Sequence, residues 1–218
     1  MAFTFPLSRA DFLDLLPVTD VKLSCPPQRQ TTGLGGGEIL TAEVAPALWR
    51  GAVALPAVKA RAADEIAALL MALDVPGGSF LAYKKNQHGP ASDPIGAALS
   101  GFSPLIKAVD EPGSQISLKG LPGWFVLSVG DMLSFSYGSA PERRALHRIA
   151  KTAAVDGSGH SSYLTITPHL RPGAAVDAAV ELVKPYFKAV IVPGSVSDGT
   201  TRNGVTSGIG FEFRQSLR

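Results

Sequence analysis

The sequence contains a single cysteine, Cys25, so no disulfide can form within the chain and no cage of thiolates can hold a metal. No apolar run approaches the roughly 20 residues that a membrane-spanning helix needs. The N-terminal segment has neither a basic start nor a long apolar stretch, so we expect no signal peptide. The formal net charge is only +2, which gives no general attraction to nucleic acid or to acidic membranes. We therefore expect a soluble protein made in the cytoplasm.

The signatures of common enzyme classes are also missing. The sequence has no GxSxG nucleophile elbow and no HExxH zinc motif. The glycine-rich segment 33–37 is not followed by Lys-Ser/Thr or by a helix, so it indicates a hairpin tip rather than a phosphate cradle. Most acidic residues fall in turns, where carboxylates usually accept backbone N–H groups; examples are Asp93, Asp110, Glu111, Asp156 and Asp177. We predict no catalytic residue and no cofactor.

Four histidines are present, and no two of them have the i,i+4 spacing of helical zinc ligands; they are His88, His147, His160 and His169. His160 and His169 flank one predicted strand and have Asp131 or Asp156 near them in the sequence. This is a weak metal-site candidate, and we predict no bound metal. Cys25 stands beside two prolines and is interpreted as a structural thiol.

What the sequence has in abundance is turn residues, with 23 glycines and 17 prolines, and these favour a β-rich fold. The stretch Leu121–Arg171 is the clearest case. Gly130-Asp131 begins a strand that places Leu133, Phe135 and Tyr137 on one face, and the turn at 156–159 separates two further strands. We predict a small antiparallel β module here, with further strands near 21–24, 38–44, 49–55, 79–83, 106–109, 116–119, 124–127, 179–183, 188–192 and 205–214.

One long helix is predicted at 58–73, where Ala62, Ile66, Leu69, Leu70 and Leu73 form an apolar stripe. A shorter helix is predicted over Ser8–Leu16, with Ser8 as its N-cap. The polar segments Lys84–Gly101 and Gly194–Gly204 are interpreted as long exposed loops. Long loops often serve binding or assembly, although simple insertion is an equal alternative.

Two further groups of residues have a functional and a structural interpretation. Trp49 and Trp124 are predicted to be core or junction aromatics, although an exposed Trp124 would suggest a platform for a sugar ring. Glu142, Arg143, Arg144, His147 and Arg148 form the densest basic cluster. It is interpreted as a solvated hairpin tip, the alternative being contact with a phosphate or an acidic partner.

Two segments resemble tail-tip proteins of long-tailed bacteriophages, especially the distal tail protein group and related alphaproteobacterial prophage proteins. The first runs from WRGAV at 49–53 through the predicted helix to GSFLAY at 78–83, and it is similar to the strand–helix–strand of tail-tube-like β-sandwiches. The second, Leu127–Arg171, contains "L..GD" and "lHri..ta.aDgsG..tl.i.P.LR". It resembles a β module that recurs in phage tail and baseplate proteins. Here that module precedes the final strand, whereas many distal tail proteins carry an accessory domain after the sandwich.

The resemblance implies a mainly β (α+β) fold: a tail-tube-like β-sandwich or split barrel with one packed helix, plus an inserted OB-like antiparallel module. Residues 1–100 and 183–218 would form the first domain and 101–182 the inserted one. It further implies a structural virion protein at the tail tip, assembled in the host cytoplasm as a homo-oligomeric ring, expected to be a hexamer. The ring would join the tail tube to the hub or receptor-binding proteins, without membrane contact or specific nucleic-acid recognition. The alternatives are a carbohydrate-binding module and a tail-associated cell-wall hydrolase.

Overall fold

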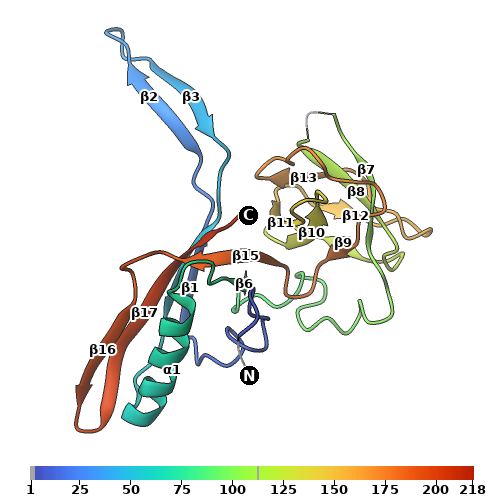
Figure 1. Ribbon diagram of the computed structural model, residues 1–218. Coiled ribbons are helices and arrows are strands. Elements are labelled where there is room, and N and C mark those ends of the chain that lie inside the picture. Colours follow the sequence, from blue (N-terminus) through green and yellow to red (C-terminus); the bar gives the residue numbers. More distant parts are fainter. Residues whose placement is uncertain (1–2, 112) are drawn as a thin grey trace.

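The computed structural model describes residues 3–111 and 113–218. Two antiparallel β modules lie side by side, and two hairpins project from one of them in opposite directions (Figure 1). Strands account for most of the regular structure, and one α-helix occurs within these residues. The predicted mainly β fold with a single packed helix is therefore confirmed.

The first module is a seven-stranded sheet, here called the body sheet, in the order β1-β4-β17-β15-β6, with β5 and β16 also paired to β17. Its strands are β1 (Asp20–Ser24), β4 (Arg50–Ala54), β5 (Val58–Lys59), β6 (Phe80–Tyr83), β15 (Tyr186–Ile191), β16 (Ser197–Arg202) and β17 (Val205–Gln215). Strands from both ends of the chain thus share one sheet, and β17 lies at its centre.

The helix α1 (Ala60–Leu73) lies along the lower part of the body sheet, next to β16 and β17 (Figure 1). Its buried side chains are Ala63, Ile66, Leu70 and Leu73, which nearly match the predicted stripe. They share a core with Phe80, Phe211 and Phe213 from the sheet. The helix begins two residues later than expected because Val58 and Lys59 pair with β17 as β5.

The second module is a six-stranded sheet, here called the barrel, in the order β14-β10-β11-β13-β8-β7. Its strands are β7 (Leu105–Val109), β8 (Gln115–Lys119), β10 (Met132–Tyr137), β11 (Arg143–Ile149), β13 (Leu164–Thr167) and β14 (Val180–Glu181), and β9 (Val126–Leu127) pairs with β12 (Ala153–Ala154) beside them. A bridge between Leu105 and Ala179 brings β7 back to the segment before β14, so the sheet is nearly closed. Closure leaves few unpaired edges.

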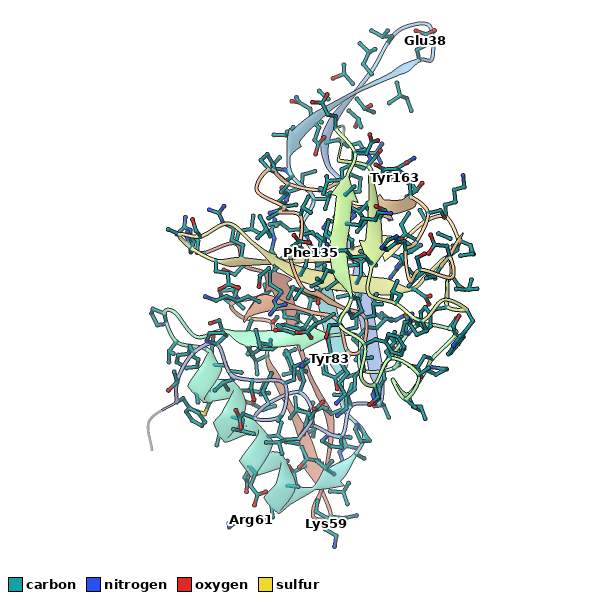
Figure 2. All side chains as sticks on the ribbon, turned by 90° about the vertical axis from the view of Figure 1, so that its right-hand side faces the viewer. Glu38, Lys59, Arg61, Tyr83, Phe135 and Tyr163 are labelled. Atoms are coloured by element: carbon teal, nitrogen blue, oxygen red, sulfur yellow. The ribbon has the colours of Figure 1, made fainter. Side chains whose placement is uncertain are left out.

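The barrel has an apolar core of its own, in which Phe135 lies near the centre of the module (Figure 2). The predicted alternation in β10 is confirmed, because Leu133, Phe135 and Tyr137 belong to the barrel core, whereas Ser134, which is also buried, accepts the Tyr186 N–H of the body sheet. Two barrel residues, Met132 and Leu146, belong instead to the core of the body sheet. The modules therefore pack against each other through apolar side chains.

The third β unit is a separate hairpin of β2 (Gln28–Gly33) and β3 (Ile39–Ala45), which projects from the body sheet (Figure 1). Glu38 marks its tip, at the opposite end of the molecule from Lys59 and Arg61 (Figure 2). The glycine segment 33–37 forms this tip, as predicted. The strand β2 was not predicted, because its sequence, QRQTTG, lacks apolar residues.

The helix predicted over Ser8–Leu16 is wrong, since this segment forms consecutive turns. Ser8 does act like a cap, because its Oγ accepts the Asp11 N–H at 3.1 Å. However, the ammonium of Lys85 donates to the backbone carbonyls of Leu13, Asp14 and Leu16. These carbonyls therefore do not accept the N–H groups of a helix. Burial of Phe12, Leu13 and Leu16 fixes the segment in this form.

The loop predicted over Gly194–Gly204 is also wrong, because it contains β16, which pairs with β17 from Ser197–Gly210 to Arg202–Val205. Asn203 and Gly204 both have positive φ and form the two-residue turn between the strands. Such turns match the twist of a hairpin and favour the Asn-Gly sequence. The segment Lys84–Gly101 contains no strand or α-helix, as predicted, although Pro90, Asp93 and Leu99 are buried in it.

Candidate functional site: exposed hairpins and a junction cleft

The β2–β3 hairpin is exposed along nearly its whole length. On one face, Arg29, Thr41 and Glu43 look toward the barrel segment 167–172, with which they line a cleft. Alternate residues of a strand point to opposite faces, so Leu40, Ala42 and Val44 form a stripe on the other face. Leu40 is 55% and Val44 68% exposed.

An isolated two-stranded hairpin is at best marginally stable in water, and exposed apolar patches on soluble proteins usually mark interaction sites. Leu40 and Val44 belong to neither core cluster of the described residues. The stripe is therefore a candidate surface for another protein chain.

Among the described residues, two strands of at least five residues, β1 and β16, form edges of the body sheet with no strand on their outer side, and the two-residue β5 is a further short edge. The edge strand β6 is partly covered by the N-terminal segment, because Leu7 forms a parallel bridge to Phe80. Every residue of β16 is exposed. Unpaired edges present rows of N–H and C=O groups that can pair with a strand of another subunit.

The junction between the modules is built around Trp49. Its ring is buried, and its indole N–H donates to the backbone carbonyl of Leu146 in β11 at 2.7 Å. The backbone N–H of Trp49 donates to the side-chain oxygen of Gln215 at 3.3 Å. The predicted role of Trp49 as a junction aromatic is confirmed.

A second junction contact joins the N-terminal segment, the barrel and the body sheet at Tyr186. The guanidinium groups of Arg9 and Arg144 lie 4.5 Å and 4.2 Å from the centre of its ring. Both arginines also face Glu181 of β14, at 3.4 Å and 3.7 Å. Arg9 in addition donates to the Lys184 carbonyl at 2.7 Å. This network holds three separate segments together.

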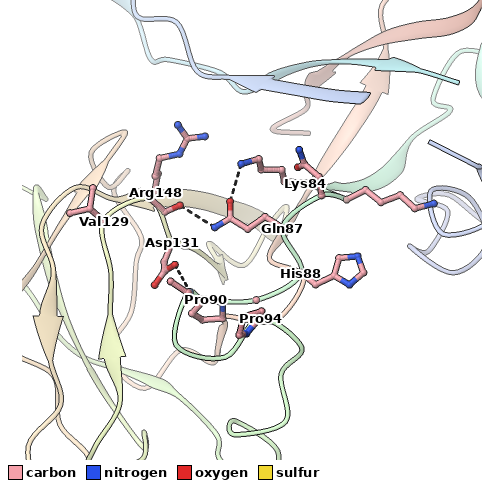
Figure 3. A pocket seen from close by; sticks show the side chains of 13 residues that line it. Lys84, Gln87, His88, Pro90, Pro94, Val129, Asp131 and Arg148 are labelled. Atoms are coloured by element: carbon pink, nitrogen blue, oxygen red, sulfur yellow. Dashed lines mark hydrogen bonds between the residues drawn. The ribbon is translucent and has the colours of Figure 1, made fainter. Parts of the chain in front are cut away.

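An open cleft of about 700 Å³, here called the junction cleft, lies where the Lys84–Gly101 segment meets the barrel (Figure 3). Lys84 donates to the Gln87 side-chain oxygen at 2.9 Å, and the amide nitrogen of Gln87 donates to the carbonyl of Gly130 at 3.2 Å. The Lys84 ammonium and the Arg148 guanidinium lie on the same side of Gln87 (Figure 3). Arg148 itself lies 5.7 Å from the centre of the Trp49 ring.

The cleft has an excess of positive charge. Burial and the neighbouring Arg148 charge lower the pKa of Lys84. The acidic residue in the lining, Asp131, is occupied by backbone donors, because it accepts the N–H groups of Ala91 and Ser128, each at 2.8 Å. Burial raises the pKa of Asp131, and its hydrogen bonds from Ser128 and Ala91 act in the opposite direction. Within the described residues, neither Lys84 nor Arg148 forms a salt bridge.

The predicted basic cluster is not a solvated hairpin tip, because residues 143–149 form β11 and only Glu142 precedes it in the turn. His147 is buried and stacks on Phe135 with 5.5 Å between ring centres. Its Nδ1–H donates to the Pro168 carbonyl at 2.6 Å. Burial lowers the pKa of His147 to about 4, so the ring is neutral near pH 7.

The other candidates for metal or thiol chemistry are dispersed. His160 contacts Lys107 at 3.2 Å, whereas His169 lies with Arg171 and His147 beside a small cavity. Residues 3–111 and 113–218 contain no group of three or more histidine, cysteine or acidic side chains that could hold a metal ion. Burial raises the pKa of Cys25 to about 11, so its thiol stays protonated near pH 7.

Several turn acids accept backbone N–H groups, as the sequence predicted. Asp93 accepts from Leu99 at 2.9 Å, and Asp156 accepts from Ser158 and His160, each at 2.9 Å. These carboxylates stabilise loops. They form no paired arrangement across a cavity in the part of the chain that the structure covers.

Trp124 was predicted to be a core or junction residue, and this is wrong, since its side chain is 65% exposed. It precedes the buried Phe125, whose ring centre lies 5.9 Å away. The backbone of Gly123 packs tightly against the turn at Asp156 and Gly157, which fixes the segment. Trp124 is therefore an aromatic ring that faces solvent from a segment packed against this turn.

Comparison with protein-family models found no family that matches the chain, and comparison with curated proteins found no similar sequence. The site must therefore be interpreted from its own geometry. No helix in the described ranges is both long enough and apolar enough to cross a membrane.

Proposed function

We propose that the protein is a structural component at the distal end of a bacteriophage tail, where copies of it form a ring that joins the tail tube to the hub or receptor-binding proteins. The observation that carries this proposal is the pair of exposed hairpins, β2–β3 and β16–β17, that extend from the body sheet in opposite directions (Figure 1). The resemblance of segments 49–83 and 127–171 to tail-tip proteins points the same way.

The two free edges of the body sheet suit a ring. Each subunit offers β1 on one side and β16 on the other, so pairing between different edges of successive subunits can close on itself. Such a head-to-tail arrangement covers both edges at once. The stripe of Leu40, Ala42 and Val44 supplies an apolar contact to a neighbouring chain.

The body sheet has one apolar face and one polar face, and a ring around a water-filled lumen needs such a polar face. One face carries Val53, Phe211 and Phe213 into the core, whereas Lys22, Arg50 and Glu212 alternate with them and are exposed. We assign this polar face to the water-filled lumen. The barrel would then lie outside the ring, where it can meet other tail proteins.

The test is the size of the particle formed by the full-length protein, measured by mass photometry and by negative-stain electron microscopy. We expect closed rings, with six subunits as the expected number. The double variant Leu40→Lys/Val44→Lys should remain folded but shift the distribution toward monomers. A protein that stays monomeric under all conditions, including in the presence of its tail partners, would contradict the proposal.

The matched control is Val176→Lys, which replaces an exposed apolar residue on the barrel with the same charged side chain. If the barrel lies outside the ring, this variant should assemble like the wild type. Loss of assembly in Val176→Lys but not in the hairpin variant would place the contact on the barrel and refute the assignment of the hairpin.

A second candidate function, carbohydrate binding at the barrel surface, is favoured by the exposure of Trp124. Sugar rings stack on exposed aromatic faces, and polar groups then fix their orientation. The Asp156–His160 turn lies directly beside Gly123 and supplies such groups. A glycan array probed with wild type and with Trp124→Ala tests this function. Binding that Trp124→Ala removes would support it, and an array without signal would contradict it.

A further inference from the structure

The junction cleft has features of a ligand site that the ring proposal does not use. Its two cations come from segments far apart in the chain, Lys84 after β6 and Arg148 within β11. Each is held by a neutral neighbour, Lys84 by the Gln87 amide at 2.9 Å and Arg148 by the Trp49 ring. Their charged groups are thus positioned without being neutralised.

The remaining charged residues of the lining are already engaged or face elsewhere. The Lys85 ammonium binds backbone carbonyls of the N-terminal segment, including that of Leu13 at 2.9 Å. Asp131 is directed at the N–H groups of Ala91 and Ser128. The His88 ring points away from the pair formed by Lys84 and Arg148 (Figure 3). The open part of the cleft therefore faces two uncompensated positive charges.

Two like charges at a partly buried position repel each other, and the pKa of Lys84 is lowered first by burial and then by the Arg148 charge. A dianion removes the repulsion more completely than a carboxylate, which carries one charge. Arginine and lysine are the usual partners of phosphate oxygens, since the guanidinium can donate two parallel hydrogen bonds and the ammonium acts as a point charge.

We propose that the junction cleft binds a phosphate group, as the free anion or as a monoester, between the Lys84 ammonium and the Arg148 guanidinium. Gln87 is a positioning residue, because it holds Lys84 and is itself tied to the Gly130 carbonyl. The bound group contacts both the body-sheet side and the barrel side, so it strengthens the junction between the modules. All residues of this site belong to one chain, so phosphate binding does not require ring assembly.

The test uses inorganic phosphate and glycerol phosphate as probes at pH 7.5, where the phosphate group is largely dianionic, with chloride at matched ionic strength as the reference. We expect either probe to raise the unfolding temperature of the wild type by roughly 5–11 °C at about 100 times its dissociation constant. Tighter binding of the ester would identify a monoester as the ligand, and equal binding would identify the free anion.

The variants Lys84→Gln and Arg148→Gln should each weaken phosphate binding at least about tenfold in calorimetry. Lys151→Gln, which removes one exposed charge of the same module, should bind like the wild type. In the wild type, phosphate should shift the NMR signals of the Gln87 side-chain amide and of the Gly130 and Ala91 backbone amides. This readout does not depend on whether a variant folds.

Three results would overturn the proposal. The first is an equal response to phosphate and chloride at matched ionic strength. The second is phosphate binding by Lys84→Gln and Arg148→Gln as tight as that of Lys151→Gln. The third is a set of NMR shifts confined to residues outside the cleft.

Discussion

The indole N–H of Trp49 donates a 2.7 Å hydrogen bond to the backbone carbonyl of Leu146, a residue 97 positions later in the sequence. The bond crosses from the body sheet to the barrel. The Leu146 side chain also belongs to the body-sheet core. A single pair of residues thus connects the two modules through both a polar and an apolar contact.

Trp49→Phe keeps an aromatic ring at the junction but removes this donor and leaves the Leu146 carbonyl without it. Loss of a buried partner usually costs about 1–3 kcal/mol, so we expect a decrease of that size in the free energy of unfolding, measured with urea. The matched control is Trp124→Phe, at the exposed tryptophan, for which the change should stay within about 0.5 kcal/mol. Equal effects of the two substitutions would contradict the assigned role of Trp49.

Gly51→Ala should destabilise the body sheet. Gly51 in β4 lies opposite Phe213 in β17, and a Cβ at Gly51 would overlap the Phe213 ring. Overpacking of this kind costs roughly 1–3 kcal/mol, which a lower urea midpoint would reveal. Gly35→Ala, at the hairpin tip, has no neighbouring atom within 4 Å and should leave the midpoint unchanged.

Stability should fall between pH 6.5 and pH 4 because of His147. Its pKa is about 4 in the folded protein, below the value of about 6.5 expected after unfolding. In this window the unfolded chain takes up the proton and the folded protein does not, so acid favours unfolding. The loss amounts to roughly 2 kcal/mol between pH 7 and pH 5.

The measurement is urea unfolding at pH 7 and pH 5 for the wild type and for His147→Gln. Other titrating groups are common to both proteins, so the difference between their pH dependences isolates His147. We expect the variant to be less stable at pH 7, since it loses the stacking on Phe135, but also less sensitive to acid. An identical pH dependence would show that the histidine does not control this loss.

Arg9→Ala should lower the free energy of unfolding more than Arg61→Ala does. The two ion pairs have similar lengths, 3.4 Å for Arg9 with Glu181 and 3.3 Å for Arg61 with Glu65. Arg61 is exposed on α1, and such surface pairs contribute about 0–1 kcal/mol. Arg9 is partly buried and also contacts Tyr186 and the Lys184 carbonyl. We expect about 1–2 kcal/mol for Arg9→Ala, by urea unfolding; a smaller effect than that of Arg61→Ala would contradict this order.

The elements that the sequence predicted well are those with one covered face. Ile66, Leu70 and Leu73 repeat at helical spacing because α1 lies on the sheet, and Ile209, Phe211 and Phe213 alternate because one side of β17 faces the core. Burial of one face imposes a period on the sequence. The helix 58–73 and the final strand could therefore be located to within about two residues.

Two of the projecting strands, β2 and β16, were not predicted, because nearly all of their residues are exposed. β2 and β16 are almost entirely polar and carry no apolar alternation. For β16 a usable signal did exist, since Asn203-Gly204 is a strong indicator of a two-residue hairpin turn. For Ser8–Leu16 the sequence pattern was helical, but the ammonium of Lys85, a residue distant in the sequence, hydrogen-bonds to backbone carbonyls of this segment.

The junction cleft could not be predicted from local patterns. Lys84 was the first residue of a segment interpreted as an exposed loop, and Arg148 was one member of a basic cluster interpreted as solvated. The fold brings them together because the chain leaves the body sheet after β6 and passes along the barrel before it enters that module. Side-chain pairs of this kind depend on topology.

The position of β17 has a consequence for synthesis on the ribosome. β4 can pair with β1 early, but its other edge stays unpaired until β17, the last strand of the sequence, has emerged. The barrel, whose strands all lie between residues 105 and 181, can fold well before that moment. The nascent chain can therefore carry a folded barrel in the middle of an unfinished body sheet. Mutations that slow the arrival or docking of the C-terminal strand should prolong exposure of Phe80 and the apolar side of α1, and so promote aggregation during expression.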